Sequence, residues 1–187
     1  MVALMTQQTS SQVLFEQYVL PHMDVMYRTA WSLTRSDTEA QDLVQETVLR
    51  AYRAIDRFDG RYPKAWLLTI MRNANINRVR KKRPDLLDDP NATFERSVDF
   101  ADTEDPETLV VDPLFSASVE KSFEALPEKF REIIQLVDLN GLSYQQAADI
   151  TAVPVGTVMS RLHRGRKRIR EHLDNQVNTE GRDDHGH

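Results

Sequence analysis

The chain has 187 residues, of which 40% are hydrophobic and 28% charged, so it suits one ordinary globular domain or two small helical ones. No apolar run approaches the roughly 18 residues that a membrane span needs, and the first residues lack the basic start of a signal peptide. We therefore expect a cytoplasmic protein without membrane insertion. The lack of cysteine excludes disulfides, thiolate metal ligands and thiol redox sensing by this chain.

The net charge of −5 is unevenly distributed along the chain. Residues 84–115 contain ten acids and one base, whereas the rest of the chain carries 23 Lys and Arg against 19 Asp and Glu. Residues 72–83 and 161–170 are rich in bases and contain no acid. Two basic patches separated by an acidic segment are typical of a protein that binds nucleic acid.

The N-terminal part is predicted to be helical, because apolar residues recur there at three- and four-residue steps. A first helix is expected over about 12–34, kinked near Pro21. A second helix over 39–53, with an N-cap at Asp37 or Thr38, has a predicted buried stripe made of Ala40, Leu43, Val44, Thr47 and Ala51. A third helix over about 64–82 follows Gly60 and Pro63, and carries Trp66, Leu67, Ile70, Met71 and Val79.

The third helix also concentrates groups that can bind nucleic acid. Asparagine is a poor helix former, yet three occur at alternate positions between basic residues, and amides can hydrogen-bond to base edges while guanidinium groups hold phosphates. The candidate DNA-binding residues of this helix are Trp66, Arg72, Asn73, Asn75, Asn77 and Arg80. Trp66 can stack on a base, but the expected place for its ring is the core.

The acidic stretch over 84–115 is predicted to be a flexible linker, because it combines several prolines with many acids. A short helix is expected near its end. The domains are therefore expected at 10–83 and 116–174, with a disordered polar tail over 175–187. Two histidines in that tail, His185 and His187, are expected to be solvated and not to bind a metal.

The second domain contains a predicted helix-turn-helix. Helices are expected at about 116–125, 128–139, 143–151 and 155–173, and Ser143 with Gln146 forms a capping-box signature at the start of the third. The last helix has one apolar face, made of Val158, Leu162, Ile169 and Leu173. Its candidate DNA-binding residues are Thr157, Ser160, Arg161, His163, Arg164 and Lys167, because short polar side chains and arginines can enter the major groove or hold phosphates.

Four motifs in this order resemble the extracytoplasmic-function branch of the sigma-70 family. They are DLVQETVLRAYR at 42–53, the stretch 63–83 that opens with PKAW, LPEKFR at 126–131, and PVGTVMSRLHRGR at 154–166. The resemblance covers about 12–83 and 116–173. It implies an all-α protein of two small helical domains that binds RNA polymerase core, recognises the −35 and −10 promoter elements and promotes melting.

The resemblance also assigns roles to particular residues. It implies that one helix face binds the clamp coiled coil of the largest polymerase subunit, through Asp42, Gln45, Glu46, Leu49 and Arg50. Asn73 would help to form a pocket for a flipped −10 base, with the loop from Phe58 to Pro63 as its other wall. The second domain would contact the polymerase flap, and an anti-sigma factor is an expected partner. Family members often have an arginine or an aromatic residue where this chain has Met159 and His163, so its −35 preference is not implied.

Two other functions compete with this one. A self-standing repressor with a helix-turn-helix needs a dimerisation element to read two half-sites, and no long apolar heptad is present. An enzyme acting on nucleic acid needs a carboxylate cluster, a phosphate-binding glycine loop or a nucleophile with its base. None of these appears in the sequence, so no catalytic, cofactor or metal site is expected.

Overall fold

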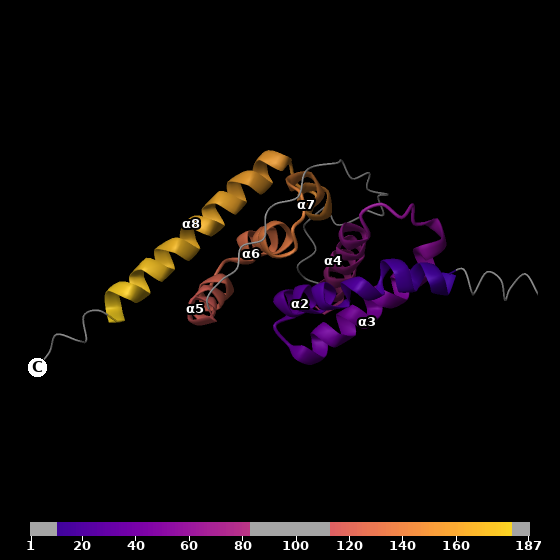
Figure 1. Cartoon of the computed structure of the whole chain (residues 1–187), viewed down its shortest axis with the longest axis horizontal. Coiled ribbons are helices and arrows are strands. Elements are labelled where there is room, and N and C mark those ends of the chain that lie inside the picture. Colours follow the sequence, from indigo (N-terminus) through magenta and orange to yellow (C-terminus); the bar gives the residue numbers. More distant parts are fainter. Residues whose placement is uncertain (1–10, 83–112, 181–187) are drawn as a thin grey trace, which may run out of the picture. The chain divides into compact units, whose positions relative to one another are not determined.

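The computed structural model describes residues 11–82 and 113–180, and within these ranges every element is helical. The chain divides into two compact units, Met1–Phe100 (unit 1) and Ala101–His187 (unit 2), which are shown in Figure 1. The predicted fold class, two small all-α domains, is confirmed. The predicted flexibility of the acidic segment falls almost wholly on residues outside the described ranges. None of the described helices is long and apolar enough to cross a bilayer.

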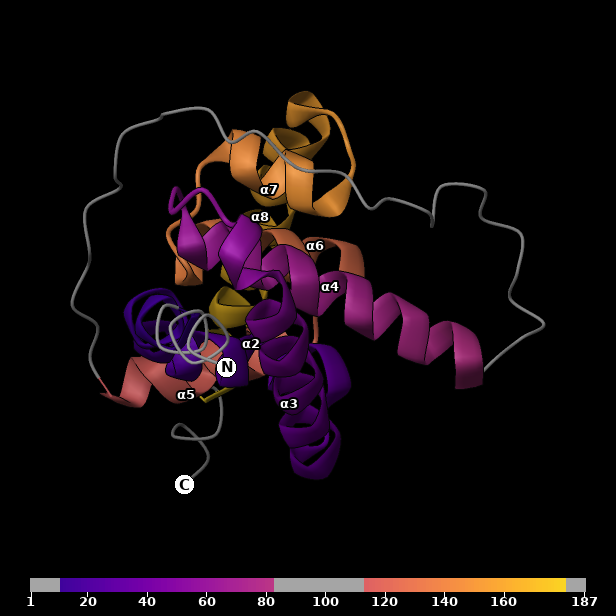
Figure 2. The ribbon, with the colours of Figure 1, turned by 90° about the vertical axis from the view of Figure 1, so that its right-hand side faces the viewer.

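Unit 1 is built on three long helices that pack in sequence. A helical segment over 11–18 leads through a 3-10 turn, Leu20–His22, into α2, Met23–Thr34. Pro21 lies in that turn, where its missing N–H breaks the α-helical ladder, so the predicted interruption is confirmed. α3, Asp37–Ala54, packs against both α2 and α4, Pro63–Lys82. Figure 2 shows how α4 crosses α3.

The core of unit 1 forms around the buried stripe of α3. All five predicted stripe residues are buried, and Met26 of α2 and Met71 of α4, the helices that pack on α3, are fully buried as well. The predicted N-cap is wrong, because Ser36 caps α3 by accepting a hydrogen bond from the Glu39 amide at 3.4 Å. Asp37 instead accepts hydrogen bonds from the hydroxyl of Tyr27 and the side-chain amide of Gln41.

The loop before α4 is held in a conformation that requires glycine. Gly60 has a φ of +81°, and a Cβ at this position would lie 2.9 Å from the hydroxyl oxygen of Tyr18. On one side of the glycine, the ring of Phe58 stacks on that of Trp66, with centroids 4.3 Å apart. The loop is therefore fixed against the first turns of α4.

Unit 2 contains α5, Pro113–Glu124; α6, Glu128–Ile134; a π-helical turn, Gln135–Leu139; α7, Tyr144–Thr151; and α8, Val155–Glu180. α5 starts three residues before the predicted boundary, since proline is accepted in the first turn of a helix. The expected disorder of the tail is wrong at its start, because α8 continues through Asn175 to Glu180. No proline or glycine interrupts the chain between Gly165 and Gly181. The two tail histidines lie outside the described residues.

The predicted helix-turn-helix is present in unit 2. Ser143 and Gln146 form the capping box at the start of α7, with hydrogen bonds of 3.1 and 2.9 Å between side chains and backbone amides. α7 ends at Ala152, which adopts a left-handed conformation with φ of +54°. α8 then packs on α6 and α7 through Val158 and Leu162, which are both buried.

Candidate nucleic-acid interfaces

The exposed face of α8 carries a polar stripe opposite its buried side. Residues three or four apart lie on the same side of a helix. The stripe formed at steps of three, four and three residues is Thr157, Ser160, Arg164 and Lys167. The last three are exposed, and Thr157 is half-buried. Arg161 and His163 lie on the two flanks of this stripe, and of the two His163 is exposed whereas Arg161 is half-buried.

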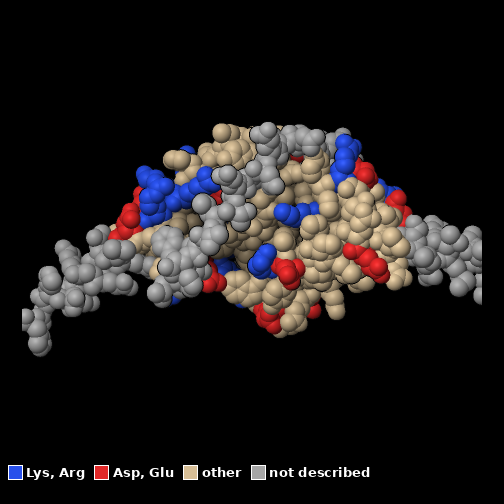
Figure 3. Space-filling view, in the orientation of Figure 1, with Lys and Arg blue, Asp and Glu red and all other residues tan. Residues whose placement is uncertain are grey.

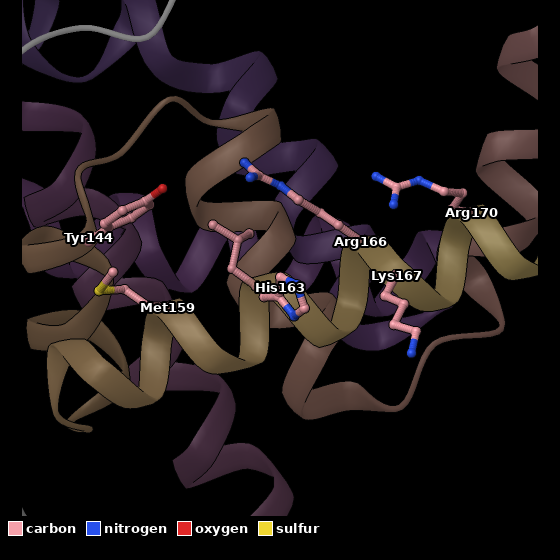
Figure 4. Close-up of a pocket in the computed structure, with 7 residues that line it drawn as sticks. Tyr144, Met159, His163, Arg166, Lys167 and Arg170 are labelled. Carbon is pink, nitrogen blue, oxygen red and sulfur yellow. The ribbon is translucent and has the colours of Figure 1, made fainter.

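A groove of about 380 Å³ runs along the His163 flank of α8. Its lining residues come from the start of α7 and from α8, and they are Tyr144, Met159, Leu162, His163, Arg166, Lys167 and Arg170. In Figure 4, Tyr144 and Met159 lie together at one end of the groove, and Arg166 and Arg170 lie farther along α8. The groove therefore has an apolar end and a cationic end. Tyr144 was not predicted, although its place in the first turn of α7, next to the N-cap Ser143, is a usable signal.

The basic residues of α8 do not all have the same role. The Arg166 guanidinium forms a bidentate pair with Asp138 of the π-helical turn, with N–O distances of 2.5 and 3.0 Å. The hydrogen bond that Arg166 donates to Asp138 is the main cause of its raised pKa, and the pair ties α8 to the π-helical turn. Arg168 lies over the ring of Phe130, 5.0 Å from its centroid. Figure 3 shows Lys and Arg side chains gathered over α8. Of the basic residues in the sequence of this helix, Arg164 and Lys167 belong to the exposed stripe.

The outer face of α4 brings together four of its six predicted residues. Trp66, Asn73, Asn77 and Arg80 are separated by seven, four and three residues, so they share one side of the helix. Asn75 lies two residues from both asparagines, about 200° around the axis, and therefore points to the other side. Trp66 is half-buried and stacked on Phe58, whereas a place in the core was expected.

Two other bases of α4 hold the helix against α3. Arg78 donates a hydrogen bond of 3.2 Å to the backbone oxygen of Glu39, and the Lys82 ammonium lies 2.6 Å from the Glu39 carboxylate. The hydrogen bond from Lys82 is the main reason why the pKa of Glu39 is lowered. These contacts position the outer face of α4.

The predicted polymerase-binding residues form one face of α3, opposite its buried stripe. Asp42, Gln45, Glu46, Leu49 and Arg50 follow the steps of three and four residues that place side chains together. The Leu49 side chain is 56% exposed although it is apolar. Arg50 and Glu46 form an ion pair at 2.6 Å. The face is therefore acidic and amide-bearing, with an apolar centre.

Comparisons with known proteins match both units. The profile of sigma-70 region 2 matches residues 18–84, and that of sigma-70 region 4 matches residues 116–169. The chain is 34% identical over 165 residues to the ECF RNA polymerase sigma factor SigW of Bacillus subtilis, and the match covers 85% of this chain and 88% of SigW. It is 31% identical over 159 residues to SigE of Mycolicibacterium smegmatis, and the match spans 85% of this chain but 61% of SigE.

Solved structures agree with these relatives. The sigma factor RpoE of Bartonella quintana, in complex with the anti-sigma factor NepR, is 32% identical with a TM-score of 0.64, covering 86% of this chain and 96% of that one. CnrH, in complex with the cytosolic domain of CnrY, is 26% identical with a TM-score of 0.58, covering 86% and 88%. The chain thus belongs to the sigma-70 family of DNA-binding transcription regulators. Within that family it is an extracytoplasmic-function sigma factor, and so a factor of transcription initiation.

Proposed function

We propose that this chain binds RNA polymerase core and directs it to promoters, with each unit recognising a different state of the DNA. The observation that carries the proposal is the difference between the two polar helix faces. α8 presents hydroxyl and guanidinium groups from a helix-turn-helix, which suits the major groove of duplex DNA. α4 presents two amides and an aromatic ring, which suit unstacked bases of a single strand. Unit 2 is assigned to the −35 element and unit 1 to −10 recognition and melting.

The exposed face of α3 is assigned to the polymerase. Its apolar centre at Leu49, surrounded by carboxylates and amides, has the composition of a protein-binding surface and not of a nucleic-acid-binding one. The proposed contact is the clamp coiled coil of the largest subunit, with unit 2 on the flap. The chain would then act in the cytoplasm without catalysis of its own. Two similar proteins have been solved as complexes, RpoE with the anti-sigma factor NepR and CnrH with the cytosolic domain of CnrY. An anti-sigma factor is therefore the proposed regulator of this chain.

The test compares two substitutions in the reconstituted holoenzyme, Arg164→Ala and Asn73→Ala. Loss of an arginine contact to a base edge or phosphate should weaken recruitment to closed promoter DNA about tenfold, and only when the −35 element is intact. Asn73→Ala should spare that recruitment but reduce melting and change the preferred −10 base. The measurements are promoter retention and permanganate reactivity, on fully duplex templates and on templates opened beforehand at −10.

Asn75→Ala is the matched control, because it removes the same amide from the opposite side of α4. If Asn73→Ala and Asn75→Ala impair melting equally, or if opening the template does not change the effect of Asn73→Ala, the single-strand role of this face is wrong. Tight binding of the isolated chain to duplex DNA would instead favour a self-standing repressor.

A further inference from the structure

The first two turns of α8 are almost uncharged. Residues 155–162 contain a single charged side chain, Arg161. Arg161 lies two positions from Met159, about 200° around the helix axis, so its side chain leaves the helix on the side away from the groove. In a helix-turn-helix, the N-terminal turns of the second helix reach base edges. The part of α8 best placed to reach bases therefore offers no cation on its groove side.

Met159 provides the principal exposed group on that side. Its side chain is 52% exposed, although the neighbouring Val158 and Leu162 are 0% and 2% exposed. It lies beside Tyr144 at the apolar end of the groove (Figure 4). The cationic groups of the groove begin about two turns later at Arg166, which is already bound to Asp138. The groove therefore has an apolar part near the base-reading turns and a charged part beyond it.

The chemistry of a thioether limits which base edge it can recognise. Methionine has no hydrogen-bond donor, and its sulfur is only a weak acceptor. Against guanine, adenine or cytosine it would leave polar groups in the major groove without a partner, which is unfavourable. Thymine alone presents an apolar group in that groove, the 5-methyl group.

We propose that Met159 is a specificity-determining residue that recognises the 5-methyl group of one thymine in the −35 duplex. The cationic end of the groove, with Lys167 and Arg170, then lies along the phosphates of the same site. This inference rests on the proposed function, because it requires α8 to enter the major groove. It differs from base recognition by an arginine, since the base it selects is identified by a methyl group and not by a hydrogen bond.

The experiment uses holoenzyme assembled with the full chain. Promoter duplexes with six randomised base pairs at −35 are first selected for retention, and each thymine of the selected sequence is then replaced singly by deoxyuridine, which removes only the methyl group. At one thymine the wild-type holoenzyme should lose about fourfold in affinity, the effect of one buried methyl-sized group. Met159→Ala should abolish the response at that position and leave it unchanged elsewhere. Met159→Leu, the matched apolar variant, should retain it.

The outcomes separate the inference from the function on which it rests. If replacing the whole −35 sequence has no effect on retention, α8 does not recognise the duplex and the proposed function of unit 2 is wrong. If the −35 sequence matters but no thymine loses affinity on demethylation, the inference alone is overturned. It is also overturned if Met159→Ala weakens every duplex equally, because the side chain would then contribute to packing or to a protein contact. Because Met159 is exposed, its variants are expected to fold, and unchanged circular dichroism checks this.

Discussion

Gly165 shows how a single residue sets the distance between the recognition helix and the rest of unit 2. A Cβ at this position would lie 2.7 Å from the Cδ1 atom of Ile134 and 3.3 Å from the Cβ atom of Phe130. The glycine is buried in the interface between α6 and α8. Glycine is unfavourable inside a helix, but here the missing side chain allows the two helices to approach closely. Gly156, in the first turn of the same helix, has no atom within 4 Å of its Cβ position.

We predict that Gly165→Leu destabilises unit 2. The new side chain cannot fit between α6 and α8 without moving them, and overpacking of this kind lowers the free energy of unfolding by about 1–3 kcal/mol. This loss exceeds the gain of up to about 1 kcal/mol from replacing glycine in a helix. Hydrogen exchange on peptides of unit 2 measures the effect, with peptides of unit 1 as an internal reference. Gly156→Leu is the control, and equal protection in both variants would contradict the prediction.

At the scale of single residues, the sequence predicts which side chains share a helix face better than which partners they have. The five stripe residues of α3 follow from periodicity alone, and all are buried. The N-cap was misplaced although Ser36 and Glu39 form the serine–glutamate spacing of a capping box. Arg166 was not predictable as an ion-pair partner, because Asp138 lies 28 positions away in the chain.

Two helices end on a residue that is not glycine but adopts the left-handed conformation. They are α2, which ends at Arg35 with φ of +56°, and α7, which ends at Ala152 with φ of +54°. Helices commonly end this way, but the position favours glycine. In any other residue the Cβ lies too close to the backbone, which costs about 1–2 kcal/mol. The turn of the helix-turn-helix therefore contains strain that one substitution can remove.

Ala152→Gly is accordingly expected to stabilise unit 2. Relief of the left-handed strain outweighs the larger conformational entropy of glycine in the unfolded chain, for a net gain of about 0.5–1 kcal/mol. Denaturant unfolding followed by circular dichroism measures the gain. Ala148→Gly is the matched control: it makes the same chemical change inside α7, where Ala148 is buried, and should destabilise by at least about 0.5–1 kcal/mol. A loss of stability in both variants would show that Ala152 is not strained.

The elements themselves were largely predictable, and the exceptions have physical causes. Every long helix of the described ranges except α8 was expected within a few residues of its observed bounds, since each combines an apolar period with a capping residue or a proline at one end. The π-helical turn at Gln135–Leu139 was predicted as ordinary helix, because its one-residue widening does not alter the apolar pattern. The last turns of α8 were predicted to be disordered, because they are polar, although neither proline nor glycine occurs between Gly165 and Gly181.

The whole molecule distributes its proposed contacts over three separate helix faces. The faces on α4 and α8 are assigned to DNA, and the α3 face, from Asp42 to Arg50, is assigned to the polymerase. The polymerase assignment followed from a family resemblance and not from physical features alone, because an exposed acidic helix face is otherwise an ordinary solvated surface. The order of the four motifs predicted the family. No pattern in the sequence predicted the apolar end of the groove, which depends on how α7 meets α8.

Reversing two charges on the α3 face should abolish assembly with the polymerase. Asp42→Lys combined with Glu46→Lys places cations where the partner is expected to meet carboxylates, and such mismatches cost several kcal/mol at an interface. The fold should persist, since neither residue is in the buried stripe, although Lys at position 46 would repel Arg50 by a few tenths of a kcal/mol. Co-purification with core enzyme should fall more than about tenfold.

The control makes the same change in charge elsewhere. Glu16→Lys combined with Glu120→Lys reverses two exposed carboxylates outside the α3 face, and should leave co-purification intact. If both double variants lose the polymerase equally, the effect is one of net charge. If the Asp42→Lys and Glu46→Lys double variant retains the polymerase fully, the α3 face does not bind it.

The stacked pair of Phe58 and Trp66 gives the protein an optical property of its own. The two tryptophans of the chain, Trp31 and Trp66, both lie in unit 1. Fluorescence excited at the red edge of the indole absorption band therefore comes from unit 1 alone, because unit 2 contains no tryptophan. Trp66 lies on the proposed single-strand face, whereas Trp31 lies against Arg35 at the end of α2. After replacement of Trp31 by phenylalanine, the protein would have a single tryptophan, located where an opening strand is expected to arrive.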